Sequence, residues 1–172
     1  MLRPGKAIII ILALLVSGLM IQACGFKLRG NVAISTDLAP VQISDLGGVS
    51  QIAPLLREAM LGQGIAVVQE STQANAIVNL MTERFDRKVL TVSSAGQVQE
   101  YALTYSVVFF VNSNDGTELL KKSSVYVERV LRFDEAALSA RAAEAGALNT
   151  SMLQDATRQI LRQMEYIPTT LK

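Results

Sequence analysis

Cys24 is the single cysteine of this 172-residue chain, and its thiol is the side chain best suited to covalent chemistry. Three parts precede it: a basic start with Arg3 and Lys6, an unbroken apolar run over residues 7–16, and a weaker stretch that ends at Ala23. This order is typical of a secretory signal peptide, in which a small residue precedes the cleavage site. The sequence therefore predicts cleavage immediately before Cys24.

The tetrapeptide Ile21-Gln22-Ala23-Cys24 resembles a lipoprotein box, although Gln22 stands where a small or β-branched residue is typical. We expect residues 1–23 to be a lipoprotein signal peptide and Cys24 to carry covalent N-acyl and S-diacylglycerol lipid. Several acyl chains on one cysteine give a stable anchor, whereas a single chain binds only marginally. An Asp after the cysteine retains many lipoproteins in the inner membrane. Gly25 occupies that place, so the resemblance to sorted lipoproteins favours the inner leaflet of the outer membrane.

A permanent transmembrane helix is the alternative for the same segment. The stretch from Ala7 to Ala23 has 17 residues, which is the lower limit for crossing a bilayer. Ser17, Gly18 and Gln22 make it less apolar. Both readings leave residues 24–172 as one domain of ordinary size, which we expect to face the periplasm.

Composition excludes several classes of site. The chain has no histidine, which removes the commonest general base and the commonest zinc ligand. Its net charge is +1 and the signal carries two of the positive charges, so nucleic acid is not an expected partner. The acidic residues are dispersed and mostly alternate with apolar ones. We therefore expect no catalytic site, no metal and no enzyme.

Residue periodicity predicts six elements after the signal peptide. Apolar residues at three- and four-residue spacings indicate a helix over 54–61 and a longer one over 142–164. The connection before the longer helix, 134–141, is expected to be partly helical. Alternating residues indicate strands over 41–43, 76–92, 101–111 and 118–133, with a bulge or bend at Asp86-Arg87-Lys88 and a hairpin at Asn114-Asp115-Gly116.

The order of these elements predicts an α+β fold. Two helices would pack on one face of a four-stranded mixed, mostly antiparallel sheet, giving a two-layer sandwich. The helix between the first two strands permits a parallel crossover there. A stripe of apolar residues on the long helix would pack on the sheet, and it consists of Leu148, Met152, Ala156, Ile160 and Met164.

Three segments resemble the lipopolysaccharide-assembly lipoproteins of the Lpt export system, the LptE or RlpB family. They are Cys24-Gly25-Phe26-Lys27-Leu28-Arg29, Gly96-Gln97-Val98-Gln99-Glu100-Tyr101, and Ala137 to Glu144 leading into the long helix. The resemblance covers most of the mature chain and implies the same two-helix, four-stranded fold. It also implies that the domain plugs the LptD β-barrel, assists its assembly, and binds lipopolysaccharide during delivery to the outer leaflet.

The resemblance further implies cationic contacts to the phosphates of lipid A, because arginine pairs with phosphate bidentately. A basic position before the long helix corresponds to Arg141, while a second one falls on Ser94, which is not basic. Arg87 and Lys88 are the nearby cations that could replace it. A lipid-anchored binding module of another envelope transport complex, without a barrel partner, remains the alternative function.

Overall fold

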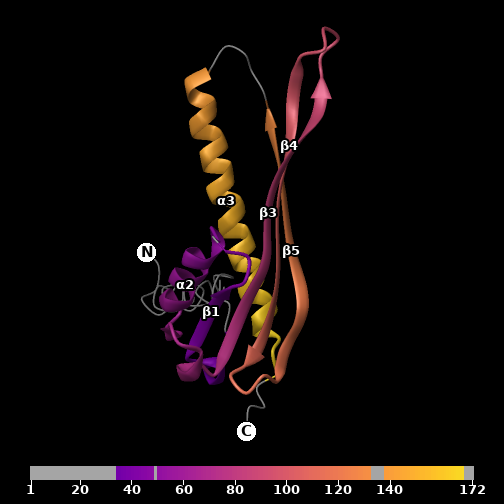
Figure 1. Cartoon of the computed structure of the whole chain (residues 1–172). Helices are drawn as coiled ribbons and strands as arrows, with labels where there is room; N and C mark the ends of the chain where they lie inside the picture. The colour runs from indigo at the N-terminus through magenta and orange to yellow at the C-terminus, as the bar shows by residue number, and fades with distance from the viewer. Residues whose placement is uncertain (1–33, 49, 133–137, 169–172) are drawn as a thin grey trace, which may run out of the picture. The chain divides into compact units, whose positions relative to one another are not determined.

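Three long strands and two short ones form a single sheet, and both α-helices pack on one face of it (Figure 1). A computed structural model describes residues 34–48, 50–132 and 138–168. All of these residues belong to one compact unit of the chain. The predicted α+β two-layer fold is confirmed.

The elements follow the predicted order with small changes of boundary. Two single-turn 3₁₀ helices, η2 (Thr36–Leu38) and η3 (Ser71–Gln73), lie in the connections. The α-helices are α2 (Ile52–Gly62) and α3 (Leu138–Glu165). The strands are β1 (Val41–Asp45), β2 (Val67–Val68), β3 (Ala76–Val92), β4 (Val98–Ser113) and β5 (Glu118–Arg132).

The sheet has five strands rather than the four predicted, in the order β2-β1-β3-β4-β5. β1 pairs in parallel with both β2 and β3, while β3, β4 and β5 form an antiparallel meander. The additional strand is β2, which is not among the four strands predicted. Two residues are too few to show alternation, and their place in the sheet comes from pairing with Val41 and Gln42.

Side chains from outside the helix hold the start of α2. The Ser50 hydroxyl accepts a hydrogen bond from the Ala53 N–H at 3.1 Å and donates one to Glu83 of β3 at 2.7 Å. The Glu83 carboxylate also accepts from the Gln51 N–H at 3.1 Å. A carboxylate at a helix N-terminus is favoured by the unpaired N–H groups and by the helix dipole. Glu83 therefore fastens α2 to the sheet.

A glycine in the left-handed conformation ends α2. Gly64 has φ of +78°, and its N–H bonds to the Leu61 carbonyl at 3.0 Å, while the Ile65 N–H bonds to the Met60 carbonyl at 3.0 Å. This pair of bonds is a Schellman motif, and Met60 and Ile65 are both buried beside it. Gly64 is therefore the C-terminal cap of α2.

The predicted stripe of α3 forms the centre of the core. Met152, Ala156, Ile160 and Met164 have no exposed surface. Leu148, at the N-terminal end of the stripe, is only partly buried. α3 therefore packs tightly over its C-terminal half and less tightly at Leu148.

The bulges of β3 are not at Asp86-Arg87-Lys88, where the sequence indicated one. Asp86 and Lys88 pair regularly with Thr104 and Ala102 of β4. The extra residues are Met81 and Leu90, because the register advances by two on β3 and one on β4 at each of them. The three charged residues do not interrupt the strand, because they follow its regular alternation.

The bulge at Met81 exchanges the two faces of β3. Val78 and Leu80 before it are buried beneath the helices. After it, Phe85 and Arg87 pair with Tyr105 and Leu103, which are residues of the helix-facing side of β4. Apolar residues thus move from even to odd positions across Met81, and this change of parity was the sequence signal for the bulge.

Candidate functional site

The three long strands continue beyond the point where β1 ends, and this part of the sheet is called the distal arm here. It comprises 82–92 of β3, 98–108 of β4 and 124–132 of β5. β1 pairs with β3 only as far as Leu80, and among the described residues β4 is the only strand that pairs with β3 in the arm. Arg87, Lys88 and the turn with Ser94 all belong to this arm or its tip.

The helix-facing side of the arm combines a cation with exposed apolar side chains. Phe85 and Val89 are 43% and 46% exposed. Arg87 lies between them, and its guanidinium carbon is 4.8 Å from the centre of the Tyr101 ring. Stacking on an aromatic face stabilises and orients a guanidinium while its edge stays available to an anion. This side of the arm therefore suits an amphiphile that has both anionic and apolar groups.

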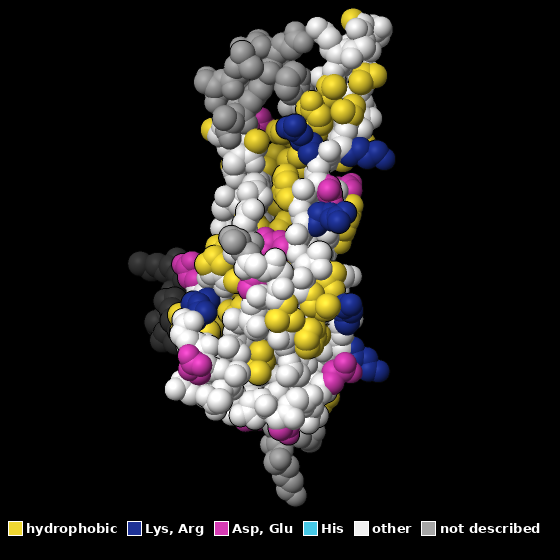
Figure 2. All heavy atoms as spheres, viewed as in Figure 1, with side chains coloured by type: hydrophobic (Ala, Val, Ile, Leu, Met, Phe, Trp, Pro, Cys, Tyr) yellow, Lys and Arg dark blue, Asp and Glu magenta, His cyan; other side chains and the backbone are white. Residues whose placement is uncertain are grey.

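The opposite side of the arm, which the helices do not cover, is more polar. Lys88 lies there, together with Arg84 and Asp86, because adjacent residues of a strand alternate between faces. Arg84 and Asp86 form an exposed ion pair at 3.9 Å. Arg87 and Lys88 thus do not share a face, although both are exposed. Figure 2 shows basic and apolar side chains close together along this end of the molecule.

Arg141 lies in the first turn of α3 rather than in a connection before it, since the helix begins at Leu138. Its side chain lies outside the described residues, as does residue Cys24. Residues 133–137 join Arg132 to Leu138, so the start of α3 lies within roughly 20 Å of the end of β5. Because Arg132 pairs with Glu100, Arg141 and the distal arm are at the same end of the fold.

Ser94 is exposed in the turn between β3 and β4. This turn is closed by Gly96, with φ of +80°, and by the Ser93 hydroxyl, which accepts from the N–H groups of Ala95 and Gln97. None of the hydrogen bonds of this turn uses the Ser94 side chain. The turn therefore presents no cation at the position where the family resemblance would place one.

A small cavity lies where the arm joins the packed part of the sheet. Its volume is about 100 Å³, and Glu83, Phe85, Tyr105, Gln51 and Asn149 line it. Tyr105 is almost wholly buried, and its hydroxyl has no hydrogen-bond partner of good geometry among the described atoms. Burial, together with the nearby Glu83 carboxylate, raises the pKa of Tyr105 far above its usual range. The hydroxyl thus stays protonated and is a hydrogen-bond donor.

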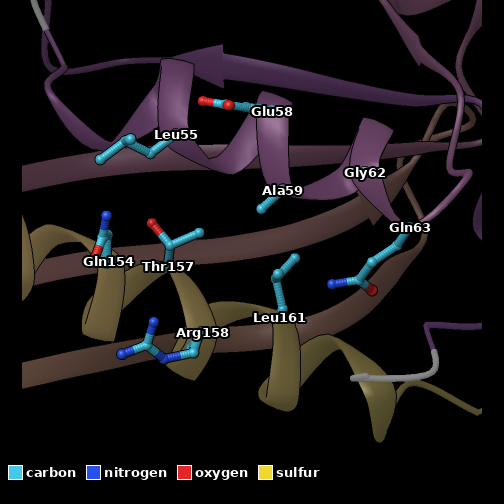
Figure 3. A pocket seen from close by; sticks show the side chains of 9 residues that line it. All are labelled: Leu55, Glu58, Ala59, Gly62, Gln63, Gln154, Thr157, Arg158 and Leu161. Atoms are coloured by element: carbon cyan, nitrogen blue, oxygen red, sulfur yellow. The ribbon is translucent and has the colours of Figure 1, made fainter. Parts of the chain in front are cut away.

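A wider groove runs between α2 and α3 (Figure 3). Leu55, Ala59 and Leu161 give it apolar walls, and Glu58 and Arg158 extend from the two helices. Arg158 also forms an ion pair with Asp155 of its own helix. The groove has a volume of about 420 Å³, but no group in it is arranged for acid–base or nucleophilic chemistry.

The described residues contain no cluster of Asp, Glu, His or Cys that could hold a metal ion. Within the same residues, the helices are too short or too polar to cross a membrane. What the geometry offers is binding surface: an amphipathic side of the arm, a polar opposite side, and the groove between the helices.

Comparison with known proteins gives consistent relatives. A model of the LptE family, described as lipopolysaccharide-assembly, matches residues 38–164. The chain is 24% identical over 146 residues to the LPS-assembly lipoprotein LptE of Photorhabdus laumondii, covering 85% of this chain and 79% of that protein.

Solved structures of two bacterial lipoproteins are also similar. Lipoprotein B of Nitrosomonas europaea superposes with a TM-score of 0.68 at 30% identity, over 82% of this chain and 90% of that one. The rare lipoprotein B of Shewanella oneidensis superposes with a TM-score of 0.61 at 25% identity, over 72% of this chain and 92% of that one. Fold and sequence thus point to the same group of proteins.

Proposed function

This chain belongs to the LptE family of lipopolysaccharide-assembly proteins, and from that membership we propose that it is an outer-membrane lipoprotein that plugs and helps assemble the LptD β-barrel. In this role residues 1–23 are removed, acylated Cys24 anchors the domain of residues 24–172 to the inner leaflet, and the domain binds lipopolysaccharide on its way to the outer leaflet. The family is one of assembly proteins and not of enzymes. The match across residues 38–164, which spans nearly the whole fold, carries the proposal.

The polar side of the distal arm supports the plug. Ser106, Thr104 and Glu128 lie on the sheet face away from the helices, along with Arg84 and Lys88. The lumen of an outer-membrane barrel is polar. A domain that occupies such a lumen needs a polar surface, and the uncovered face of this sheet provides one. The apolar core lies on the helix side of the sheet and uses no surface of the polar face.

The helix-facing side of the arm supports the lipopolysaccharide contact. Arg87 supplies a positive charge for a phosphate, while Phe85 and Val89 supply apolar surface for acyl chains. Arg141 is the second candidate, because the start of α3 lies at this end of the fold. Lys88 faces the other side and would contribute through long-range attraction rather than by a shared contact.

Affinity purification of the acylated protein from solubilised outer membranes tests the barrel partnership. We expect a large barrel protein to remain bound through detergent washing. Recovery with envelope transport proteins and without any barrel would favour the alternative, a lipid-anchored binding module of another complex. If Cys24→Ser still incorporates labelled palmitate, the lipoprotein assignment is wrong.

Binding of purified lipopolysaccharide tests the cationic contacts. Arg87→Glu and Arg141→Glu should each weaken binding at low salt, and the double variant should weaken it most. Arg162→Glu is the matched control, since Arg162 is an exposed arginine in the last turn of α3. If the double variant and the control bind lipopolysaccharide equally well, Arg87 and Arg141 are not part of the binding site. The barrel partnership is tested separately, by the purification.

A further inference from the structure

The distal part of β3 has an open edge. Hydrogen bonds from β1 to β3 continue to Leu80, where the Leu46 N–H bonds to the Leu80 carbonyl at 2.8 Å. The chain then turns away at Gly47, where an added Cβ would lie only 3.0 Å from the Met81 carbonyl oxygen. From Thr82 to Val92, β4 is the only strand paired with β3 among the described residues. Alternate residues of this stretch therefore direct their N–H and C=O groups to an unpaired side.

Exposed apolar side chains gather on this same stretch. Phe85, Val89, Leu90 and Val92 are between 43% and 55% exposed, and they are four of the nine large hydrophobic residues exposed in the described part of the chain. On the helix-facing side, Phe85 and Val89 adjoin the open edge. Monomeric proteins seldom leave an apolar edge strand uncovered, because it is a template for pairing with another strand.

The charge of the edge selects what can pair with it. Within residues 82–92, Arg84, Arg87 and Lys88 are positive and Glu83 and Asp86 are negative, which gives a net charge of +1. Arg84 and Lys88 point to the open face, while Phe85 and Val89 point to the helix side. A strand beside β3 would gain most from acidic residues on the first side and apolar residues on the second.

Two occupants from this chain fit less well. Residues 26–29 alternate apolar and charged, but the charges are Lys27 and Arg29, which the positive edge would repel. A second copy of residues 82–92 would bring another net charge of +1 to the interface. Like charges on paired strands destabilise the pairing, so neither occupant matches the edge.

We infer that residues 82–92 of β3 form a docking site for an extended segment of a partner protein, in which apolar residues alternate with acidic ones and which adds as a further strand to the sheet. The segment would occupy the position that β1 vacates after Asp45. Main-chain hydrogen bonds would supply affinity, and contacts with Phe85, Val89, Arg84 and Lys88 would supply specificity. This docking shares Phe85 and Val89 with the proposed lipopolysaccharide contact but differs from it in kind, because it requires backbone pairing, which a lipid cannot provide.

A synthetic peptide with the sequence Val-Glu-Val-Thr-Val-Glu-Val is a direct probe. Threonine takes the position beside Asp86, while the two glutamates lie beside Arg84 and Lys88. Binding to the full mature chain is measured by fluorescence anisotropy, with Val-Lys-Val-Thr-Val-Lys-Val as the charge control. A third peptide keeps the glutamates but carries N-methyl groups on alternate amides, which blocks strand pairing and preserves the side chains.

We expect the glutamate peptide to bind at least tenfold more tightly than either control peptide. Arg84→Glu should weaken its binding about tenfold, whereas Arg162→Glu should not. Equal binding of the N-methylated peptide would overturn strand addition, and equal binding of the lysine peptide would overturn the acidic partner. Lipopolysaccharide binding is measured in parallel, and its loss or retention does not decide these outcomes.

Hydrogen exchange of the free protein decides between the occupants. The edge amides of residues 82–92 should exchange rapidly in the free protein. They should become protected when the glutamate peptide is added. If the edge amides are protected at every protein concentration, and Leu28→Pro abolishes that protection, the chain's own residues 26–29 cover the edge. Protection that grows with protein concentration would show a second copy. Either result would overturn the proposal.

Discussion

The packed half of the domain and the distal arm share one strand but not one environment. Val41, Ile52, Leu56 and Met60 in the packed half have no exposed surface, and the first five residues of β3 lie between two neighbouring strands. In the arm the same strand has one neighbour among the described strands, and its apolar side chains are about half exposed. The difference shows that β3 stays paired with β4 beyond the point where its own apolar side chains are buried.

This contrast separates stability from recognition along a single element. Burial of apolar surface is the dominant favourable term in folding, and it is concentrated where both helices cover the sheet. On β3 in the arm, Phe85 and Val89 gain less from folding than the buried residues of β4 and β5 beside them. Their surface remains available for a ligand or partner, which is the use proposed for them above.

The largest expected effect is in the packed half. Ile160→Ala should lower the free energy of unfolding by about 2–5 kcal/mol, because Ile160 is fully buried in the α3 stripe. Val89→Ala in the arm should cost less than about 1 kcal/mol, since its side chain is nearly half exposed. Urea denaturation of both variants measures the difference. Similar losses would contradict the division into two regions.

An intermediate effect is expected at the boundary between the regions. Glu83→Ala removes the acceptor for Ser50 and Gln51 at the start of α2 and should cost about 1 kcal/mol. Glu83→Gln keeps one carbonyl oxygen and should cost less. Glu118→Ala serves as the control, because Glu118 is exposed at the start of β5. A loss at Glu83 no larger than at Glu118 would show that α2 does not depend on β3 for its cap.

Native-state hydrogen exchange should resolve the same contrast without mutation. Amides that pair β3 with β1, such as those near Val78, should open only with global unfolding. Amides that pair β3 with β4 in the arm should open locally at lower free energy, because fewer buried contacts hold them. Uniform protection along β3 would mean that the arm and the packed half unfold as one cooperative unit.

The smallest effect concerns the hairpin between β4 and β5. Asp115 accepts hydrogen bonds from the Ser113 hydroxyl and from the Thr117 N–H, and these bonds lower the pKa of its carboxyl below the ordinary 3.8. A lowered pKa in the folded state contributes stability at pH values above 3.8, which is lost as the pH falls through the folded value. The difference in unfolding free energy between wild type and Asp115→Asn should therefore narrow below about pH 4. If the difference in unfolding free energy does not change with pH, protonation of the Asp115 carboxyl is not coupled to folding.

Periodicity was enough to predict the elements that bury a regular stripe. The α3 stripe, the alternation of β4 and the long span of β3 are patterns of burial, and burial repeats along the sequence with the period of the element. The cap at Gly64 was also within reach, since it needs only a glycine in the left-handed conformation after an apolar helix.

Features that depend on distant residues were not predicted. β2 exists because two residues meet β1, and Glu83 caps a helix that begins 31 residues earlier in the chain. The bulge of β3 was placed at the charges near Arg87 instead of at Met81. Arg87 and Lys88 are adjacent residues of one strand, so alternation alone predicts that they point to opposite faces. Their different faces could therefore be predicted from the sequence.

The bulge at Met81 makes the faces of the arm independent of chain length at this point. A regular strand through Met81 would put Arg84 and Lys88 on the helix side, whereas the extra residue puts Phe85 and Arg87 there. Deletion of Met81 would remove the bulge and leave Thr82 opposite Val108, so the same side chains would still face the helices. Arm residues of homologues that differ by one residue here are therefore best compared through their partners on β4, and not by their distance along the chain.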